Sequence, residues 1–341
     1  MMAQVPWGCF WIEGSPVAVG FRASDSASPG GCVKAIICTE YGPPQVLQLR
    51  DIPKPEPQPD QLLVRVFATA VTSSDCFVRS GKVSPAFWLP MRIFVGFSRP
   101  RQGVLGMVFS GEVESVGEKV LSFKPGDHVF GFDRFAFGTY AQYKCIGQNG
   151  IVAAKPPYDS HDEAAAVPYG GLLALSYLQR ANLTDGERVL IYGASGAVGT
   201  SAVQIAKHLG AIVTAASSAS NLELVRALGP DVVVDYAAEQ AAFEPFDLIF
   251  DAVGKRKSSA FKLQCRKWLS PTGQYLSVDD GSPILSVSNL LLLKTLVEQG
   301  KIKPVIDRTY PLEKAADAHA YVEQGHKKGN VILTVTENAL P

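Results

Sequence analysis

The segment at residues 193–199 constrains the fold of this chain more than any other part of the sequence. It follows the apolar run Arg188–Tyr192, which is typical of a buried strand, and it opens a helical pattern that Gly210 closes. In this strand–turn–helix context, glycine-rich turns bind the pyrophosphate of a dinucleotide. The free N–H groups at the helix start and the helix dipole favour the negative phosphates.

The turn itself is a variant of the dinucleotide-binding fingerprint. It reads Tyr192-Gly193-Ala194-Ser195-Gly196-Ala197-Val198-Gly199, so Ala194 stands where the first glycine is usual. Gly196 allows the backbone to approach the pyrophosphate, and Gly199 allows the helix to pack closely on the strand. The predicted cofactor-binding residues of the turn are Ala194, Ser195, Gly196, Ala197, Val198 and Gly199. A tight turn without a ligand is the alternative.

The sequence after about Ser160 alternates between helical and strand patterns. We predict helices over 162–166, 171–180, 198–209, 221–228, 258–269, 290–299 and 312–323, and strands over 188–192, 212–215, 232–235, 247–251, 274–278 and 331–335. This alternation predicts a doubly wound parallel sheet, the Rossmann fold. After Asp251 come Ala252, Val253 and Gly254, which should border the cofactor crevice at the carboxyl ends of the strands. An ordinary strand-to-helix turn is the alternative.

The first half of the chain contains short strands and turns instead. The runs 35–38 and 46–49 flank Gly42-Pro43-Pro44 as in a hairpin, and further strands are expected at 62–70, 104–116, 129–132 and 140–146. We therefore predict a poorly ordered extension over 1–32 and a mostly β domain, a partly open barrel, over 33–159. A Rossmann domain is predicted over 160–303, and residues 304–341 are predicted to return to the first domain.

The composition argues against several classes of partner. The 32 Lys and Arg residues balance the 32 Asp and Glu residues, so no charge pattern indicates nucleic acid or an anionic membrane. No apolar run reaches the roughly 18–20 residues of a membrane span. The six cysteines are scattered, which indicates reduced thiols and a cytoplasmic protein. Organelle targeting by residues 1–32 is the alternative, although Glu13 and Asp25 are unusual in such a leader.

The segment after the second predicted Rossmann strand indicates which nicotinamide cofactor is used. NAD sites place a carboxylate about 20 residues beyond the glycine turn, where it binds the ribose 2′-hydroxyl. This chain has no acid there before Glu223. Ser217, Ser218 and Asn221 offer hydrogen-bond donors to a 2′-phosphate instead. We predict a preference for NADPH, modest because neutral donors are weaker than charged ones, with NADH possible.

Further motifs lie on both sides of the glycine turn. They are Lys34-Ala35-Ile36 with Tyr41-Gly42, Lys124-Pro125-Gly126-Asp127-His128-Val129-Phe130-Gly131, Gln204-Ile205-Ala206-Lys207, Asp235-Tyr236, Asp251-Ala252-Val253-Gly254 and Gly300-Lys301-Ile302-Lys303-Pro304-Val305-Ile306. Together they resemble the medium-chain dehydrogenase/reductase superfamily, on its zinc-independent quinone oxidoreductase branch. The resemblance implies a GroES-like catalytic domain beside the Rossmann domain, a homodimer, and hydride transfer from NAD(P)H to a quinone, enone or similar activated carbonyl compound. It also implies that Tyr236 lies beside the adenosine.

The chain departs from the family pattern at several positions. Thr72 and Phe77 stand where relatives often have Asn and Tyr in contact with nicotinamide or substrate, so these two are the catalytic candidates. Asn221 replaces a basic residue near the 2′-phosphate, and Asn330 replaces the lysine of a late Gly-Lys pair. Met107 stands within the Gly-His-Glu ligand run of zinc-bearing relatives, and their cysteine ahead of the Thr/Ser-Asp pair is missing. We therefore predict that no metal is bound.

The remaining candidates have plainer explanations. Asp75 precedes a possible short helix and is expected to cap it. Cys76 is expected to fill space in the core, and none of the five histidines has metal-ligand spacing. A proline-rich stretch carries aromatic residues that form either a wall of the substrate cleft or the packing under a long loop: Phe87, Trp88, Phe94 and Phe97.

Two functional hypotheses follow from these observations. The leading one is an NADPH-dependent reductase of a small quinone or enone, in which backbone N–H groups and Thr72 polarise the acceptor and water supplies the proton. The other is a catalytically quiet sensor that binds NADPH on the same scaffold. Cofactor oxidation with a panel of acceptors distinguishes them.

Overall fold

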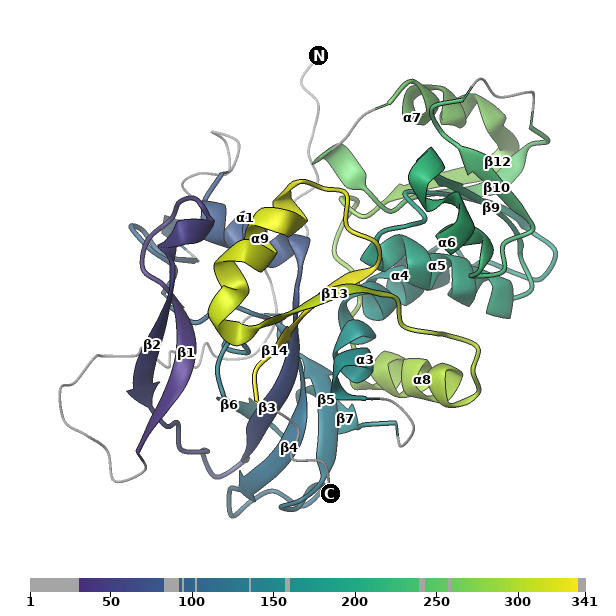
Figure 1. Cartoon of the computed structure of the whole chain (residues 1–341). Coiled ribbons are helices and arrows are strands. Elements are labelled where there is room, and N and C mark those ends of the chain that lie inside the picture. The colour runs from purple at the N-terminus through teal and green to yellow at the C-terminus, as the bar shows by residue number, and fades with distance from the viewer. Residues whose placement is uncertain are drawn as a thin grey trace. The chain divides into compact units, whose positions relative to one another are not determined.

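The computed structural model of the chain describes residues 31–82, 92, 93, 95–101, 103–134, 136–156, 160–238, 243–256 and 259–336 (Figure 1). The described residues form two compact units. The α/β unit contains residues 170–289 and 299–302, and the β-rich unit contains residues 31–169, 290–298 and 303–336, apart from the gaps given above. Nearly all of the extension predicted over 1–32 lies outside the described residues.

The α/β unit is built on a five-stranded parallel sheet. Its strands lie in the order β10-β9-β8-β11-β12, with the bounds Val232–Asp235, Ile212–Ser217, Arg188–Tyr192, Phe246–Asp251 and Leu269–Ser277. From β8 the chain builds β9 and β10 on one side, and it then crosses to β11 and β12 on the other. The strand order therefore reverses between β8 and β11, and such sheets bind ligands at the carboxyl ends of the strands at this point.

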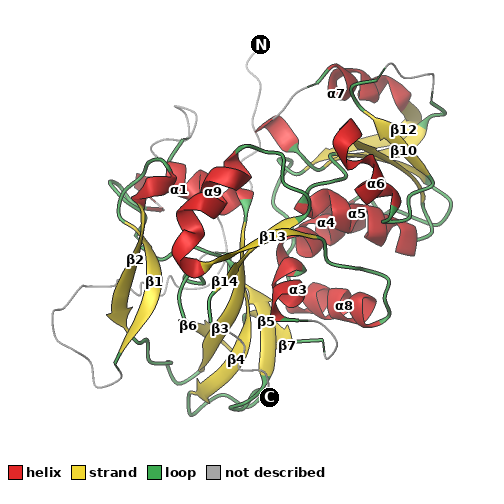
Figure 2. Cartoon of the chain, in the orientation of Figure 1, coloured by secondary structure: helices red, strands yellow, loops and turns green. Residues whose placement is uncertain are grey.

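Helices connect these strands (Figure 2). Helix α5 (Ala197–His208) follows β8, α6 (Leu222–Arg226) follows β9 and α7 (Ala260–Gln264) follows β11, whereas α4 (Pro168–Arg180) precedes β8. Residues 189–191 of β8 and 249–250 of β11 have no exposed surface. Parallel strands with helices on both faces are apolar throughout, which is why these segments are continuous apolar runs in the sequence. The predicted Rossmann sheet is confirmed.

The β-rich unit contains a hairpin and a seven-stranded sheet, which confirms the mostly β, GroES-like prediction. In the sheet the order is β13-β14-β3-β4-β5-β7, and β6 pairs with β3. The strands are β1 (Cys32–Cys38), β2 (Leu47–Pro53), β3 (Gln61–Val71), β4 (Val108–Val116), β5 (His128–Phe132), β6 (Tyr143–Gly147), β7 (Ile151–Ala154), β13 (Ile306–Pro311) and β14 (Asn330–Thr334). The helices are α1 (Ser73–Ser80), α3 (His161–Ala166), α9 (Ala315–Glu323) and part of α8 (Val287–Glu298).

The C-terminal segment takes part in this second sheet. Strand β14 pairs antiparallel with β3, with Val331 opposite Val71, and parallel with β13. The sheet therefore combines strands that lie more than 200 positions apart in the sequence. In the described part of the chain, no helix is both long enough and apolar enough to cross a membrane.

Some predicted boundaries are wrong. The strand predicted from residue 104 begins only at Val108, because Gly106 has a φ of 90° and interrupts the extended backbone. The helix predicted over 258–269 is shorter, since a 3-10 turn follows α7 and β12 already begins at Leu269; Ser258 lies outside the described residues. The sequence does not predict β7, which has only four residues, or β13, whose residues are mostly polar.

Candidate cofactor site

The glycine turn joins β8 to α5 through a bend that is fixed by backbone hydrogen bonds. The N–H groups of Gly193 and Ala194 both donate to the Ala216 carbonyl at 3.0 Å, and Gly193 has a φ of 80°. Gly196 is the N-cap of α5 and provides no side-chain cap. The first N–H groups of a helix have no partner within the helix, so Ala197 and its neighbours present donors at the turn.

The two later glycines of the turn have different surroundings. A Cβ atom added to Gly199 would lie 2.1 Å from the Gly193 carbonyl oxygen, so only glycine lets α5 pack this closely on the turn. A Cβ atom added to Gly196 would meet only that same oxygen, at 3.7 Å. The space beside Gly196, at the positive end of α5, is therefore open. These residues fit the pyrophosphate of a dinucleotide.

Asn221 connects the next predicted cofactor segment to the turn. Its Nδ2 donates to Ser195 Oγ at 3.1 Å, and the other polar atom of the amide is buried without a partner among the described residues. A buried acceptor without a partner is costly, so this atom fits a hydroxyl group of a bound ribose. The structure thus brings together two predicted site residues that lie 26 positions apart.

The serines after β9 differ in what they can donate. Ser217 is buried, and its hydroxyl donates to the Ser218 carbonyl at 3.3 Å. Ser218 is partly exposed, with its hydroxyl 3.3 Å from that of Ser220. Tyr236 donates its backbone N–H to the Ser217 carbonyl, and its ring centroid lies 5.7 Å from that of Tyr192. Of the two hydroxyl groups, that of Ser218 is the more accessible to a ligand.

The turn Ala252–Gly254 lies against the glycine turn. Ala252 donates its N–H to the Tyr192 carbonyl at 3.0 Å, and a Cβ atom on Gly193 would lie 2.3 Å from Val253 Cγ2. Both turns follow adjacent parallel strands, β8 and β11, so their contact is a consequence of the sheet register. The residues predicted from the sequence to contact the cofactor in this unit therefore share one edge of one sheet.

Asp251 and Lys262 are two residues of this edge that were not predicted as site residues: Asp251 was named only as a strand end and motif member, and Lys262 was not identified. Asp251 is buried at the carboxyl end of β11, and Lys262 Nζ lies 2.6 Å from its Oδ2. A charged residue that ends an apolar strand was the available signal, because a buried carboxylate needs partners. Lys262 follows in α7, and no periodic pattern in the sequence links it to Asp251, so the pairing was not recognisable from spacing.

Thr72 and Phe77 lie in the β-rich unit. Thr72 is the N-cap of α1, and Asp75 completes a capping box with it. Asp75 is therefore the third residue of the helix, not a residue before it. Phe77 has 44% of its surface exposed, whereas Thr72 has only 2%. The Gly106 N–H donates to Asp75 Oδ1 at 3.2 Å, so this carboxylate also fixes the backbone ahead of β4.

A chain of buried polar side chains continues from Asp75. Burial raises the pKa of Asp75 to about 6, against the opposing hydrogen bonds from Thr72, Gly106 and Tyr140. The Tyr140 hydroxyl lies 3.1 Å from His319 Nε2, and Arg79 Nε donates to His319 Nδ1 at 3.3 Å. Because the guanidinium can only donate, Nδ1 accepts and the proton of the neutral ring lies on Nε2. Burial and then Arg79 lower the pKa of His319 to about 3.

Cys76, Asn330 and Phe97 were also named from the sequence, and all three lie in the β-rich unit. Cys76 is buried, and burial, followed by the Asp75 charge, raises the pKa of its thiol to about 12, which suits a space-filling role. Asn330 begins β14 and donates both its backbone N–H and its Nδ2 to the Val305 carbonyl. Phe97 is exposed, whereas Phe87, Trp88 and Phe94 lie outside the described residues.

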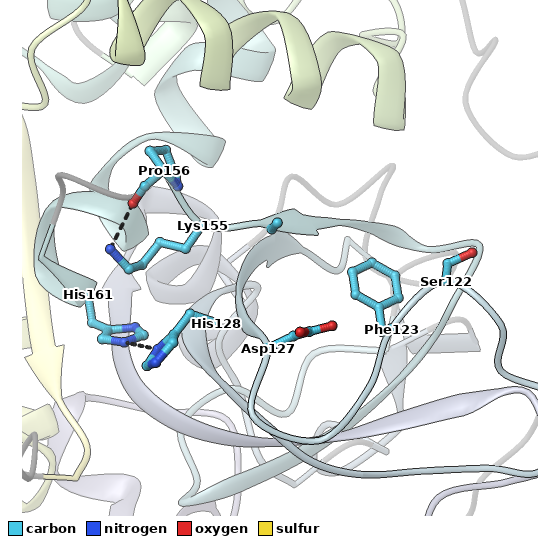
Figure 3. Close-up of a pocket in the computed structure, with 8 residues that line it drawn as sticks. Ser122, Phe123, Asp127, His128, Lys155, Pro156 and His161 are labelled. Atoms are coloured by element: carbon cyan, nitrogen blue, oxygen red, sulfur yellow. Dashed lines mark hydrogen bonds between the residues drawn. The ribbon is translucent and has the colours of Figure 1, made fainter. Parts of the chain in front are cut away.

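A separate pocket of about 550 Å³ lies in the β-rich unit and contains none of the predicted site residues. Figure 3 shows His128 and His161 facing one another beside Lys155 in this pocket. His128 Nδ1 lies 3.0 Å from His161 Nε2, and His161 Nδ1 lies 2.8 Å from the Ser110 hydroxyl. Burial lowers the pKa of His161 to about 3, with Lys155 and His128 adding to this effect. The sequence gives no signal for this pair, because 33 positions separate the two rings.

Metal ligands do not gather in the described ranges. Within those ranges, no group of three or more His, Cys, Asp or Glu side chains is placed to hold a metal ion. Met107, at the position of the zinc-ligand run, is buried.

Two family models and several characterised proteins match this chain. The alcohol dehydrogenase GroES-like domain matches residues 58–157, and the zinc-binding dehydrogenase family matches residues 228–333. The 2-methylene-furan-3-one reductase of Solanum lycopersicum is 31% identical over 94% of this chain and 84% of its own length. The chloroplastic NADPH-dependent alkenal/one oxidoreductase of Arabidopsis thaliana is 32% identical over 88% of this chain and 79% of its own length.

A solved structure also matches this chain over most of its length. The quinone oxidoreductase of Coxiella burnetii superposes with a TM-score of 0.79 at 31% identity, and the match covers 90% of this chain and all of that one. The match extends over both units, the GroES-like and the Rossmann. The chain belongs to the medium-chain dehydrogenase/reductase superfamily, on its quinone oxidoreductase-like branch, and is an oxidoreductase.

Proposed function

We propose that this protein transfers hydride from NADPH to the activated carbon–carbon double bond of an enone or to a quinone. The observation that carries the cofactor assignment is the open space beside Gly196, with Ser195 and Asn221 joined next to it. The acceptor class rests on the relatives, whose names specify a furanone reductase, an alkenal/one oxidoreductase and a quinone oxidoreductase. The bound dinucleotide would supply the hydride from its nicotinamide ring.

The residues have distinct roles in this proposal. The N–H groups of the glycine turn bind the pyrophosphate, with Val253 and Gly254 alongside, and Tyr236 flanks the adenosine. The exposed ring of Phe77 contacts the acceptor. Thr72 caps α1 and is not a proton donor to the acceptor, because its hydroxyl proton is directed to Asp75 at 2.6 Å. Backbone N–H groups polarise the acceptor oxygen and water supplies the proton, since Phe77 has no proton to give. Asn330 is a further candidate contact to the cofactor.

The preference for NADPH over NADH rests on the absence of an acid beside the 2′ position. Ser218 and Asn221 are neutral donors, and a carboxylate at either position would repel a 2′-phosphate. The buried, unpartnered atom of the Asn221 amide supports a contact to the ribose of either cofactor. We therefore propose a modest preference for NADPH.

Four properties of the whole protein are part of the same proposal. The functional domains are 33–159 with 304–341, and 160–303. The reaction proceeds without zinc. The protein is a homodimer joined through β12, which is an edge strand of the α/β sheet and has one strand partner among the described residues. We propose the cytoplasm as its compartment, although some relatives carry chloroplastic or mitochondrial names.

The decisive experiment follows NADPH oxidation with a panel of quinones and enones. Turnover with members of the panel supports the reductase. Tight binding of NADPH without turnover on any acceptor would support the sensor instead. The physical reason for such an outcome would be that Phe77 has no side-chain group that can donate a proton. A protein that binds neither cofactor would refute both.

A further inference from the structure

Asp251 accepts hydrogen bonds from five groups at the edge of the α/β sheet. Its Oδ1 accepts the N–H groups of Val253 and Gly254, each at 3.0 Å. Its Oδ2 lies 2.6 Å from Lys262 Nζ, 3.1 Å from the Tyr275 hydroxyl and 3.4 Å from that of Ser277. The carboxylate is 1% exposed, so every partner is drawn from the protein. One side chain thus joins the ends of β11 and β12 to α7.

The two carboxylate oxygens of Asp251 bind different parts of the α/β unit. Oδ1 fixes the turn that follows β11, and Oδ2 anchors the carboxylate to the next strand and helix. Lys262 also donates to the Gly254 carbonyl, so the same turn is held at its N–H groups and at its C=O group. Gly254 has a φ of 71°, a conformation that glycine adopts without steric cost.

The opposite charges of Asp251 and Lys262 also affect the electrostatic field at the glycine turn. A buried carboxylate beside the glycine turn would repel the pyrophosphate of a dinucleotide, and the ammonium at 2.6 Å cancels this charge. The pair is therefore neutral as a unit, although each member alone would change the field at the phosphates. The side chains of both residues are largely shielded from solvent, at 2% and 14% exposure, so salt screens them weakly.

We propose that Asp251 and Lys262 form a positioning pair that holds residues 252–254 in the conformation that receives the dinucleotide. This inference rests on the proposed cofactor function and adds residues that would not themselves touch the cofactor. The pair acts on the turn and not on the adenosine ribose, so its loss weakens NADPH and NADH binding by the same factor.

Two double variants that leave the net charge of the pair unchanged test the positioning of the turn separately from the charge of Asp251. Asp251→Ala with Lys262→Met removes the acceptor of the two turn N–H groups, whereas Asp251→Asn with Lys262→Met keeps an oxygen that can accept them. Asp247→Ala is the matched control, because Asp247 lies at the other end of β11 and accepts the Arg188 N–H at 3.0 Å and the Ser270 hydroxyl at 3.3 Å. The dissociation constants of NADPH and NADH are measured by titration calorimetry, and folding is measured by urea denaturation.

The alanine double variant should raise both dissociation constants about tenfold, the effect of losing roughly one charge-assisted hydrogen bond. The asparagine double variant should stay within about threefold of the wild type, and Asp247→Ala should lower stability without changing either constant. Lys262→Met alone should weaken both cofactors by a similar factor at low and at high ionic strength, because it leaves a carboxylate uncompensated where salt screens weakly. This variant keeps the proposal testable if the alanine double variant does not fold.

The outcomes distinguish this inference from the proposed function. If the wild type binds both cofactors and the alanine double variant, although destabilised, binds them equally well, the pair is structural and the inference is wrong. Equal weakening by Asp247→Ala would also refute it, because the effect would then follow from general loss of stability. A wild type that binds neither cofactor would refute the proposed function itself, and the inference with it.

Discussion

The Thr72 hydroxyl donates to Asp75 Oδ2 at 2.6 Å, and the Asp75 backbone N–H donates back to the Thr72 oxygen at 3.2 Å. A hydroxyl group has one proton, and here that proton is directed to a buried carboxylate. The residue that the family pattern identifies as a catalytic candidate is thus a helix cap in this chain. Its neighbour Phe77 is the exposed member of the two candidates.

Thr72→Val should lower the free energy of unfolding by about 1–2 kcal/mol, as expected for loss of an N-cap hydroxyl. Catalysis at neutral pH should change little, because the hydroxyl proton is not available to an acceptor. Thr72→Ser keeps the cap and serves as the control. Urea denaturation and kcat with a saturating enone test both statements. A loss of kcat of about a hundredfold in a folded Thr72→Val protein, restored in Thr72→Ser, would assign the hydroxyl a donor role.

Arg79→Leu should cost about 3 kcal/mol of stability or more. The guanidinium is 1% exposed, and it donates to the Gly42 carbonyl, His319 Nδ1 and Glu323. Removing it takes a donor from the buried His319 ring and leaves Glu323 without this ion pair. Arg308→Leu is the control, since Arg308 is about half exposed beside Asp307 and its loss should lower stability much less. Equal shifts of the urea midpoint in the two variants would contradict this assignment.

Ser218→Asp should reduce kcat/KM for NADPH and move the preference toward NADH. The new carboxylate would repel the 2′-phosphate and accept a hydrogen bond from the 2′-hydroxyl. Ser218→Asn has the same size without the charge and should change the ratio of the two kcat/KM values much less. An unchanged ratio in Ser218→Asp would mean that the 2′ position lies elsewhere.

Acidification should destabilise the protein through its buried histidines. His161 and His319 ordinarily titrate near 6.5 but near 3 in the folded chain, so below about pH 6.5 the unfolded chain binds two protons that the native state does not. The carboxyl group of Asp75 has the opposite effect on stability. Its pKa is raised from 3.8 to about 6 by folding, so between these two pH values only the folded chain binds this proton. The net difference of about one proton among these three groups lowers stability by roughly 1 kcal/mol per pH unit from about pH 6 to 4. His161→Gln should flatten the slope of urea stability against pH, and an unchanged slope would refute this explanation.

Chelation should leave the activity intact. The described ranges contain no cluster of three or more metal-ligating side chains, and Met107 has no oxygen or nitrogen to bind zinc. Dialysis against EDTA, followed by elemental analysis and an NADPH oxidation assay, tests the proposal. Stoichiometric zinc in the active protein, lost together with activity and restored by zinc alone, would overturn it.

Local sequence predicted much of the α/β unit. Strands β8 and β10 begin and end where the apolar runs predict. In β8 the reason is burial, because a strand covered on both faces must be apolar throughout. The 3-10 turn after α7 and the polar strand β13 were missed, since neither has a periodic apolar face. Thr72, Ser218 and Asn221 were identified as candidates, but their hydrogen-bond partners were not.

The sequence by itself determined the glycine turn, the alternation of strands and helices and the family, because these depend on residues close together in the chain. Only the tertiary structure decided which polar groups pair. Asp251 meets Lys262 and Tyr275, and Arg79 meets His319 across 240 positions, because sheet register and helix packing bring distant segments together. A buried charge is tolerated only where partners of this kind neutralise it and bond to it. The local sequence pattern does not show which distant residues these partners are.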